Sequence, residues 1–396
     1  MSGPKSRKTR IVCISDTHNQ TPKLPKGDVL IHAGDLTNQG SYSELKKTVE
    51  WLEKTDFEAK IVVAELLGNH DITLDRDFYK GHGSSWRWPS PQDPEQNRGL
   101  LTESKSITYL ENEAACIFLN SPEGPRTCFK VYGSPCTPKV DDWAFQYEAC
   151  RASVLWDAIP SDAHVVVTHT PPKGHCDRAT KDDRSGCEAL IHALRRVRPM
   201  LCVFGHIHEA RGVGRVQWNR HVPGGACQDG GGVEEWRDPG EGNNKQSLVD
   251  LTPKGGRPLR NSGVQIRSPV RDFLTRTVVG GQVMRPEVLQ PGSLISTSSL
   301  EAALDGEAGW RTVQGGAIEY RQAGAPGDGS HISGGEGGGE GGEGEGEADV
   351  EGTERRETCM INAALLGPRT GGPKSFNKPV VVDISLPVWD SGWTAE

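Results

Sequence analysis

Short apolar runs recur along the first half of the chain and form the clearest pattern in the sequence. They are rich in β-branched residues and four to eight residues long, which is typical of strands buried inside a sheet. The segments between the runs have a different periodicity. Strands are therefore predicted over residues 10–15, 29–33, 60–67, 129–133, 164–168 and 201–204.

Two of the segments between these strands have helical periodicity. Residues 41–54 begin with Ser41 and have Glu44 three positions later, the spacing of a capping box, and their apolar residues fall on one face. Residues 186–197 also carry apolar side chains at helical spacing and stop just before Pro199. This alternation of strands and helices predicts an α/β or α+β layered fold.

The pattern fails after about residue 219. From there to residue 357 the chain is rich in Gly and Pro, has weak periodicity and ends in a Gly/Glu-rich tract over 324–357. Such a tract has too few apolar side chains to offset the entropy that it would lose on ordering. Strand-like runs resume at 358–366 and 379–386. The predicted organisation is a flexible N-terminus (1–8), the main part of a domain (9–218), a largely disordered insertion (219–357), C-terminal strands that complete the domain (358–387) and a tail (388–396).

The distribution of charge does not point to a polyanionic partner. The chain has 53 acidic and 45 basic residues, a net charge of −8, and the 324–357 tract alone holds ten acidic and two basic residues. The rest of the chain is therefore neutral, and no specific nucleic-acid binding is predicted. No apolar run approaches the ~18 residues that a membrane span needs. The ten cysteines have no paired spacing, so we expect a cytoplasmic protein with reduced thiols and no membrane partner.

Five short blocks place metal-binding side chains at the ends of predicted strands. Each block alone has a structural explanation, because Asp, Asn and His are common in turns, loops and helix caps. Together they bring carboxylate, imidazole and amide groups to the carboxyl edge of a sheet, where ligands bind in α/β folds. These groups suit divalent Mn, Fe or Zn. The blocks are Asp16-Thr17-His18, Gly34-Asp35, Gly68-Asn69-His70-Asp71, Thr168-His169 and Gly205-His206-Ile207-His208.

The order of these blocks resembles the pattern DxH, GD, GNH[DE], H and GHxH of the calcineurin-like metallophosphoesterase superfamily. Further stretches resemble a narrower branch of it, the metallophosphoesterase-domain-containing proteins first described from brain, which are class III phosphodiesterase-like. These stretches include His32-Ala33-Gly34-Asp35-Leu36-Thr37, Thr168-His169-Thr170-Pro171-Pro172 and Ile361-Asn362-Ala363. The resemblance covers roughly residues 9–218 and 358–387. It implies two facing mixed β-sheets flanked by helices, with metals at the strand ends.

The resemblance also implies a role for each residue of the blocks. The first metal is expected on Asp16, His18 and His208, with Asp35 bridging to a second metal on Asn69, His169 and His206. Two ions of Mn, Fe or Zn are expected, with Mn favoured in vitro, and a hydroxide that bridges them would attack phosphorus. His70 is expected to stabilise or protonate the leaving oxygen, with Asp71 orienting it.

One block departs from a common form of the pattern. Many superfamily members have GDxxDRG, in which a second Asp braces the catalytic His and an Arg grips the phosphate. This chain has Asn38 and Gln39 at those two positions, which argues against a phosphoprotein phosphatase and leaves open what braces His70. The resulting prediction is a phosphodiesterase acting on a small phosphate ester or nucleotide, possible substrates including a cyclic nucleotide. A phosphomonoesterase and a metal-binding scaffold protein of low activity remain alternatives, and the insertion is a candidate surface for a protein partner.

Overall fold

The computed structural model describes residues 5–64, 70–85, 88, 90–139, 144–180, 183–218, 233–261, 276–284, 309–312, 318–321, 355–368 and 374–389. The chain divides into two compact units, one formed by residues 1–285 and 352–396 and the other by residues 286–351. The described part of the second unit is an antiparallel pair of strands, β16 (Gly309–Thr312) and β17 (Ile318–Arg321).

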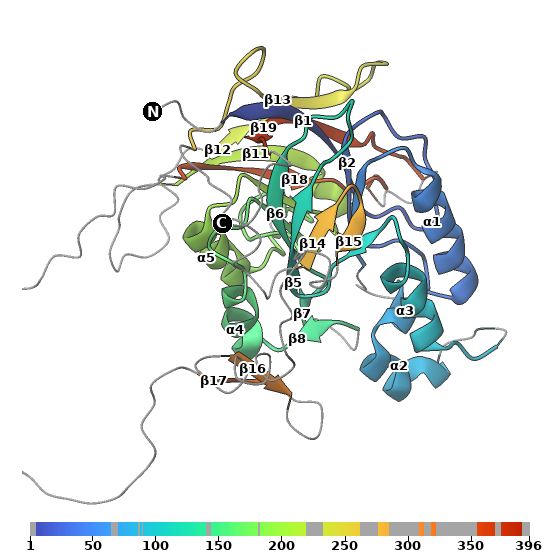
Figure 1. Ribbon diagram of the computed structural model, residues 1–396. Helices are drawn as coiled ribbons and strands as arrows, with labels where there is room; N and C mark the ends of the chain where they lie inside the picture. The colour runs from blue at the N-terminus through green and yellow to red at the C-terminus, as the bar shows by residue number, and fades with distance from the viewer. Residues whose placement is uncertain are drawn as a thin grey trace, which may run out of the picture. The chain divides into compact units, whose positions relative to one another are not determined.

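Two large mixed sheets form the first unit (Figure 1). The order of the first sheet is β13 (Ser247–Leu251), β19 (Val380–Pro387), β1 (Ser6–Ile14), β2 (Val29–Ala33), β3 (Ala59–Val63) and β4 (Thr108–Tyr109). Strands β1, β2, β3 and β4 are parallel, and β19 pairs antiparallel with β1 on the side away from β2.

The order of the second sheet is β12 (Val233–Glu235), β11 (Gly212–Gln217), β18 (Glu357–Asn362), β10 (Leu201–Phe204), β9 (Val165–Thr168), β6 (Cys128–Ser134), β5 (Glu113–Phe118), β14 (Arg276–Val279) and β15 (Gln282–Met284). The strands at its centre, β18, β10, β9 and β6, are parallel. A small separate pair consists of β7 (Thr137–Pro138) and β8 (Gln146–Tyr147).

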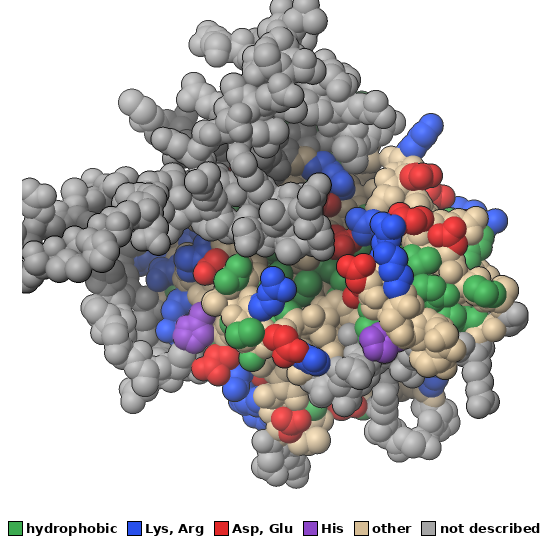
Figure 2. Space-filling model, turned by 90° about the horizontal axis from the view of Figure 1, so that it is seen from below, with side chains coloured by type: hydrophobic (Ala, Val, Ile, Leu, Met, Phe, Trp, Pro, Cys, Tyr) green, Lys and Arg blue, Asp and Glu red, His purple; other side chains and the backbone are tan. Residues whose placement is uncertain are grey.

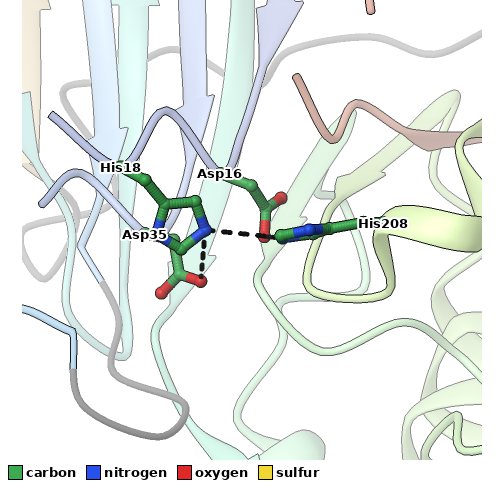
Figure 3. Close-up of side chains that lie close together, drawn as sticks. All are labelled: Asp16, His18, Asp35 and His208. Atoms are coloured by element: carbon green, nitrogen blue, oxygen red, sulfur yellow. Dashed lines mark hydrogen bonds and ion pairs between the residues drawn. The ribbon is translucent and has the colours of Figure 1, made fainter. Parts of the chain in front are cut away.

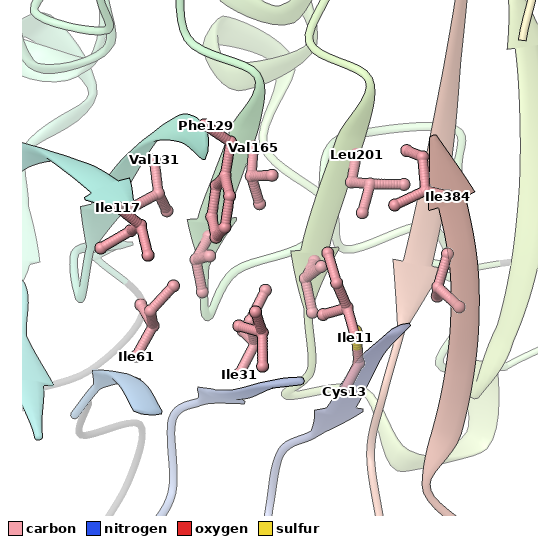
Figure 4. Close-up of a cluster of buried hydrophobic side chains, with 14 of the residues drawn as sticks. Ile11, Cys13, Ile31, Ile61, Ile117, Phe129, Val131, Val165, Leu201 and Ile384 are labelled. Atoms are coloured by element: carbon pink, nitrogen blue, oxygen red, sulfur yellow. The ribbon is translucent and has the colours of Figure 1, made fainter. Parts of the chain in front are cut away.

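The main hydrophobic core lies between the two sheets. Ile11 and Ile31 of the first sheet face Val165 and Leu201 of the second, and all four side chains have no exposed surface (Figure 4). Because successive side chains of a strand point to opposite faces, the alternate positions of the same strands are available to pack on helices. The strands are therefore buried on both sides, which explains their continuous apolar sequence.

Helices cover the outer face of each sheet. Helix α1 (Tyr42–Lys54) packs Leu45 and Leu52 against Val12 of the first sheet, and it begins with the capping box between Ser41 and Glu44. On the second sheet, α4 (Ala152–Asp157) and α5 (Glu188–Val197) pack against β9 and β10. The remaining helical segments are α2 (Arg76–His82), α3 (Pro94–Thr102) and the 3-10 turns η1 (Ile72–Leu74), η2 (Gly83–Ser85), η3 (Ala149–Arg151) and η4 (His208–Ala210).

The predicted fold class, an α/β arrangement of two mixed sheets flanked by helices, is confirmed. The predicted helices at 41–54 and 186–197 correspond to α1 and α5, and each predicted strand overlaps a strand of one of the two sheets. The N-terminal boundary differs from the prediction, since β1 begins at Ser6 and its first residues pair with β19.

The insertion also differs from the prediction of a largely disordered segment. Residues 233–261 and 276–284 contribute β12, β13, β14 and β15, which extend both sheets at their edges. Alternating burial along β13 shows why it joins a sheet, since its first, third and fifth residues are buried. The Gly/Glu-rich tract up to residue 354 lies outside the described residues, as do residues 390–396 of the predicted tail.

Three further properties of the described residues concern surface charge, thiols and the polarity of the helices. On the face seen in Figure 2, acidic and basic side chains are interspersed rather than gathered into a patch of one sign. Each of the nine cysteines that the structure describes is a free thiol. Within the described part of the chain, no helix combines the length and apolarity required to cross a bilayer.

Candidate metal centre

The predicted metal-binding side chains meet at the carboxyl ends of four central strands. Asp16 and His18 follow β1 and Asp35 follows β2, both in the first sheet, while His169 follows β9 and His208 follows β10 in the second. The two sheets therefore contribute side chains to one place. Asn69 lies outside the described residues.

Four of these side chains form a compact group. Asp16, His18, Asp35 and His208 each offer one ligand atom, and these atoms lie within 4.8 Å of one another (Figure 3). The Nε2 atoms of His18 and His208 are 3.4 Å apart, and Nε2 of His208 is 3.1 Å from Oδ1 of Asp16. All four residues are buried. Buried imidazole and carboxylate groups at this spacing are the donor set that divalent transition metals prefer.

Asp35 occupies the position between the two predicted metal sites. Its Oδ2 atom is 3.5 Å from Nε2 of His18 and 3.6 Å from Nε2 of His169. One carboxylate oxygen is thus shared by a histidine assigned to each metal. The same Nε2 of His169 is 3.9 Å from Oδ1 of Asp16, so His169 adjoins the four-residue group.

His206 lies on the other side of His169. Their ring centroids are 5.3 Å apart, and the backbone N–H of His206 is 3.1 Å from both carboxylate oxygens of Asp16. The main chain of the GHxH block therefore holds Asp16, a predicted ligand of the first metal. The ring of His206 lies next to His169, a predicted ligand of the second metal.

The ring of His169 is oriented by a hydrogen bond from the strand opposite it. Its Nδ1 is 2.8 Å from the carbonyl oxygen of Ala33, and a carbonyl only accepts, so Nδ1 carries the proton and Nε2 presents its lone pair towards Asp35. The next residue, Gly34, has φ of +110°, and a Cβ there would lie 2.2 Å from Nδ1 of His169. Only glycine permits this close approach.

Burial keeps the histidines in the form that binds metals. Removal from water, followed by the nearby charge of His70, lowers the pKa of His18 to about 3, and burial also lowers the pKa of His169. Neutral imidazole is the metal-binding form. For Asp16, burial opposes ionisation, but the hydrogen bond from His208 and the neighbouring His169 hold its pKa below the ordinary value. The described residues therefore fit a divalent metal centre.

Four of the candidate ligands adopt a backbone conformation that side chains rarely tolerate. Asp16, His18, Asp35 and His206 have φ values of +55°, +44°, +54° and +70°. Residues in the left-handed region store strain and are concentrated at functional sites. The two blocks of the first sheet support each other, since the N–H of Asp16 donates to Gly34 and that of His18 donates to Asp35. This strain was not predicted, because none of the four is a glycine.

His70 lies beside the metal group. Its ring centroid is 4.3 Å from that of His18, and its Nδ1 donates to the carbonyl oxygen of Asn38 at 2.7 Å. The carboxylate of Asp71 accepts hydrogen bonds from the backbone N–H groups of Leu36 and Thr37 and from the Thr37 hydroxyl. Burial raises the pKa of Asp71 to about 7 against the effect of these hydrogen bonds.

Sequence reasoning did not identify two contributors to this arrangement. Asn38 acts through its backbone carbonyl, which no residue type signals. Asn362, at the end of β18, donates to the carbonyl of Ile207 at 2.9 Å and to that of Cys176 at 3.1 Å. Its side chain is fully buried, and no pattern in the sequence indicates that it would join these two loops.

Comparison with known proteins agrees with this geometry. The family model described as calcineurin-like phosphoesterase matches residues 9–210. The chain belongs to the calcineurin-like phosphoesterase family. The match spans all five blocks of candidate ligands, so the family assignment and the site rest on the same part of the chain.

Three relatives illustrate the extent of the similarity. A probable rhamnogalacturonate lyase C of Emericella nidulans is 42% identical over 53% of this chain and 18% of that protein. Metallophosphoesterase domain-containing protein 1 of Homo sapiens is 38% identical over 55% of this chain and 66% of that protein. A UPF0046 protein of Caenorhabditis elegans is 35% identical over 52% of this chain and 71% of that protein.

These matches confirm the resemblance to the superfamily and to its metallophosphoesterase-domain-containing branch. The matched stretch is less than two thirds of the length of the first two relatives.

Proposed function

We propose that this chain is a dinuclear metal-dependent phosphodiesterase. The observation that supports two metals is the placement of Asp35, whose Oδ2 lies 3.5 Å from Nε2 of His18 and 3.6 Å from Nε2 of His169. An oxygen shared in this way is suited to bridge two cations. One ion would be held by Asp16, His18 and His208, the other by Asn69, His169 and His206, with Asp35 common to both.

The protein side chains have distinct tasks in this proposal. Two divalent ions, when bound, would lower the pKa of a water molecule and neutralise charge on the phosphoryl oxygens. Asp16 and Asp35 supply the negative charge that retains such ions, and the neutral rings of His18 and His169 complete their coordination. His70, beside His18, would donate a proton to the leaving oxygen. Mn, Fe and Zn all suit this mixture of nitrogen and oxygen ligands, with Mn favoured in vitro.

The preference for a diester follows from the block that contains Asp35. Position 39 is Gln in this chain, so this block offers no guanidinium to grip a phosphate. A phosphate monoester carries about two negative charges near neutral pH, whereas a diester carries one and depends less on such a group. A small diester, for example a cyclic nucleotide, is therefore the proposed substrate class.

Hydrolysis of two model esters tests the proposal. The protein is loaded with Mn²⁺ and assayed with bis-p-nitrophenyl phosphate and p-nitrophenyl phosphate, and its metal content is measured. We expect turnover of the diester and a loss of at least about 100-fold in Asp35→Asn. The control is Asp162→Asn, because Asp162 is a half-exposed carboxylate that precedes β9, at the end opposite His169.

Each other outcome contradicts part of the proposal. Equal turnover by wild type and Asp35→Asn would exclude the shared carboxylate as a metal bridge. Turnover of the monoester alone would favour a phosphomonoesterase. Metal binding without turnover of either ester would favour a scaffold protein that has kept the fold.

A further inference from the structure

The group that braces His70 is a backbone carbonyl. Nδ1 of His70 lies 2.7 Å from the carbonyl oxygen of Asn38. A carbonyl only accepts hydrogen bonds, so Nδ1 carries the proton of this hydrogen bond. Proton exchange with a substrate is then confined to Nε2. Asn38 stands at the position where many family members have the bracing Asp, so the main chain replaces a carboxylate here.

A backbone carbonyl can orient a ring only if its loop is held in place. The carboxylate of Asp71 accepts from the N–H of Leu36 at 2.9 Å and from the N–H of Thr37 at 2.8 Å. The hydroxyl of Thr37 also donates to Asp71 and accepts from the N–H of Gly40 at 2.7 Å. These hydrogen bonds fix the chain on both sides of Asn38. Asp71 and Thr37 are both fully buried.

Tight packing adds to this restraint at the end of the loop. Gly40 has φ of +72°, and a Cβ there would lie 2.4 Å from the backbone of Asp71. Its carbonyl accepts from the hydroxyl of Thr73 and from Nδ2 of Asn97. Segment 36–40 is therefore joined to segment 71–73 at both of its ends, on either side of Asn38.

We propose that the hydrogen bonds between Thr37 and Asp71 hold the Asn38 carbonyl in place, and that this carbonyl positions the ring of His70. The position of the ring in turn sets how well His70 delivers a proton. This inference rests on the proposed hydrolase function. In the step concerned, a hydroxide oxygen forms a bond to phosphorus and the bond from phosphorus to the leaving oxygen breaks. The leaving oxygen takes the electron pair of that bond and the Nε2 proton of His70. Nδ1 of His70 keeps its own proton in the hydrogen bond to the Asn38 carbonyl, and a proton from solvent replaces the one that Nε2 gave up. Thr37 and Asp71 are positioning residues because neither takes part in the transfer.

Substitutions at Thr37 separate positioning from stability. Thr37→Val keeps the shape but removes the hydroxyl, and Thr37→Ser restores it. The matched control is Thr48→Val, since the Thr48 hydroxyl in α1 is fully buried and makes no hydrogen bond among the described residues. Asp71→Asn, which loses one accepting oxygen, serves as a second variant if Thr37→Val does not fold.

Leaving-group dependence is the kinetic readout. Methyl phenyl phosphate needs protonation of its leaving oxygen more than methyl p-nitrophenyl phosphate does. We expect kcat of Thr37→Val to fall about tenfold further for the phenyl ester than for the nitrophenyl ester, with little change in KM or metal content. Thr37→Ser should recover most of the loss, and Thr48→Val should show no selective effect.

Histidine NMR supplies a readout that does not depend on turnover. In ¹⁵N-histidine spectra of the zinc-loaded protein, the Nδ1–H signal of His70, assigned by its absence in His70→Gln, should shift in Thr37→Val and remain in Thr48→Val. An equal loss of kcat for both esters, or an unchanged Nδ1–H signal in Thr37→Val, would overturn the positioning role. Failure of wild type to hydrolyse either ester would instead refute the hydrolase function and leave the NMR test of positioning intact.

Discussion

At the scale of single residues, the site is stabilised against its own backbone strain. Four candidate ligands, Asp16, His18, Asp35 and His206, have positive φ values, and each such residue costs about 1–3 kcal/mol. The surrounding hydrogen bonds, such as those from the His206 N–H to Asp16, offset this cost. A substitution that displaces one ligand should therefore break hydrogen bonds that hold the other strained ligands. Even a small added side chain should then disturb the whole site.

Gly34→Ala tests this idea directly. The new Cβ would lie 2.2 Å from Nδ1 of His169, so we expect His169 to move away from Asp35 and metal content to fall by about one ion per chain. Gly242→Ala is the control, because Gly242 also has a positive φ but has no neighbouring atom within 4 Å of the added Cβ. Equal metal content of both variants, measured by elemental analysis after dialysis, would show that the close approach of Gly34 to His169 is not needed for metal binding.

Asn362 offers a second test at this scale. Its amide group joins the carbonyl of Ile207, between His206 and His208, to that of Cys176 in the loop after His169. We expect Asn362→Ala to weaken metal retention against a chelator by about 10- to 100-fold, as for other residues that orient ligands.

The control for Asn362 stands at the other end of β18. Asn261 also uses its side chain to bind the backbone, at Arg356 and Glu357, away from the metal group. Asn261→Ala should lower thermal stability and leave metal retention unchanged. If both variants lose metal to the same degree, the Asn362 amide has no specific role in the site.

The part of the site made by side chains could be predicted from the sequence, and the part made by the backbone could not. Side chains such as Asp35 and His169 were predictable, because their residue types and their places after strands indicate metal binding. The contribution of Asn38 was not, since a backbone carbonyl is common to every residue. The conformations of the ligands were also hidden, because Asp and His adopt a positive φ more readily than most residues but still uncommonly, so tertiary contacts decide which positions do so.

At the scale of elements, the central strands were predicted and the edge strands were not. Strands such as β2 and β10 are buried on both faces, which gives them continuous apolar sequences. Strand β13 is partly exposed on one face, and its sequence Ser-Leu-Val-Asp-Leu has neither a continuous apolar run nor a regular alternation over its five positions. In a segment rich in Gly and Pro, a pattern this short is weak, and the pairing with β19 that confirms it is non-local.

The pairing of β1 with β19 leads to a prediction about pH. Asp383 on β19 is nearly buried and accepts two hydrogen bonds of 2.7 Å from Arg10 on β1, with Lys8 also within 3.5 Å. Burial opposes ionisation of Asp383, but Arg10 outweighs it and lowers the pKa below 3.8. A lowered folded-state pKa means that the stabilisation is complete above pH 3.8 and is lost as the pH falls through the folded-state pKa.

Urea unfolding in the presence of a chelator measures this effect without interference from metals. Asp383→Asn should be less stable than wild type by about 1–3 kcal/mol at pH 5 to 7, and the difference should shrink below about pH 3.8. The control Asp157→Asn removes an exposed carboxylate that is 3.9 Å from Arg196 and should change little. A difference independent of pH would mean that the ion pair does not contribute through its charge.

At the scale of the whole first unit, the described parts of the insertion contact the chain just after the GHxH block. Arg211, three residues after His208, donates to Asp238 at 2.9 Å, to Ser247 at 3.1 Å and to the carbonyl of Lys378 at 2.9 Å. Asp238 and Ser247 both belong to the inserted segment. Where the structure describes it, from residue 233 onward, the insertion is therefore part of the folded unit that carries the GHxH block.

The return of the chain into the domain is also earlier than predicted. Glu357, with 1% of its side chain exposed, binds Arg215 and Arg260, and Arg355 donates to the carbonyls of Ser161, Asp162, Ala163 and Val197. Burial opposes ionisation of Glu357, but Arg215 and Arg260 lower its pKa. A dispensable tract should therefore end before Arg355.

A deletion, alone and combined with a substitution, tests where the folded unit resumes. Removal of residues 324–354 should change the melting temperature by less than about 2 °C, because the ion pairs of Glu357 and the hydrogen bonds of Arg355 to backbone carbonyls remain. Glu357→Gln in the same background leaves Arg215 without its buried partner and should lower the melting temperature by about 5 °C or more. Glu148→Gln, which breaks an exposed pair with Lys139, is the matched control. A large drop from the deletion alone would place the Gly/Glu-rich tract inside the folded unit, since only a segment that buries surface in the native state can stabilise it on this scale.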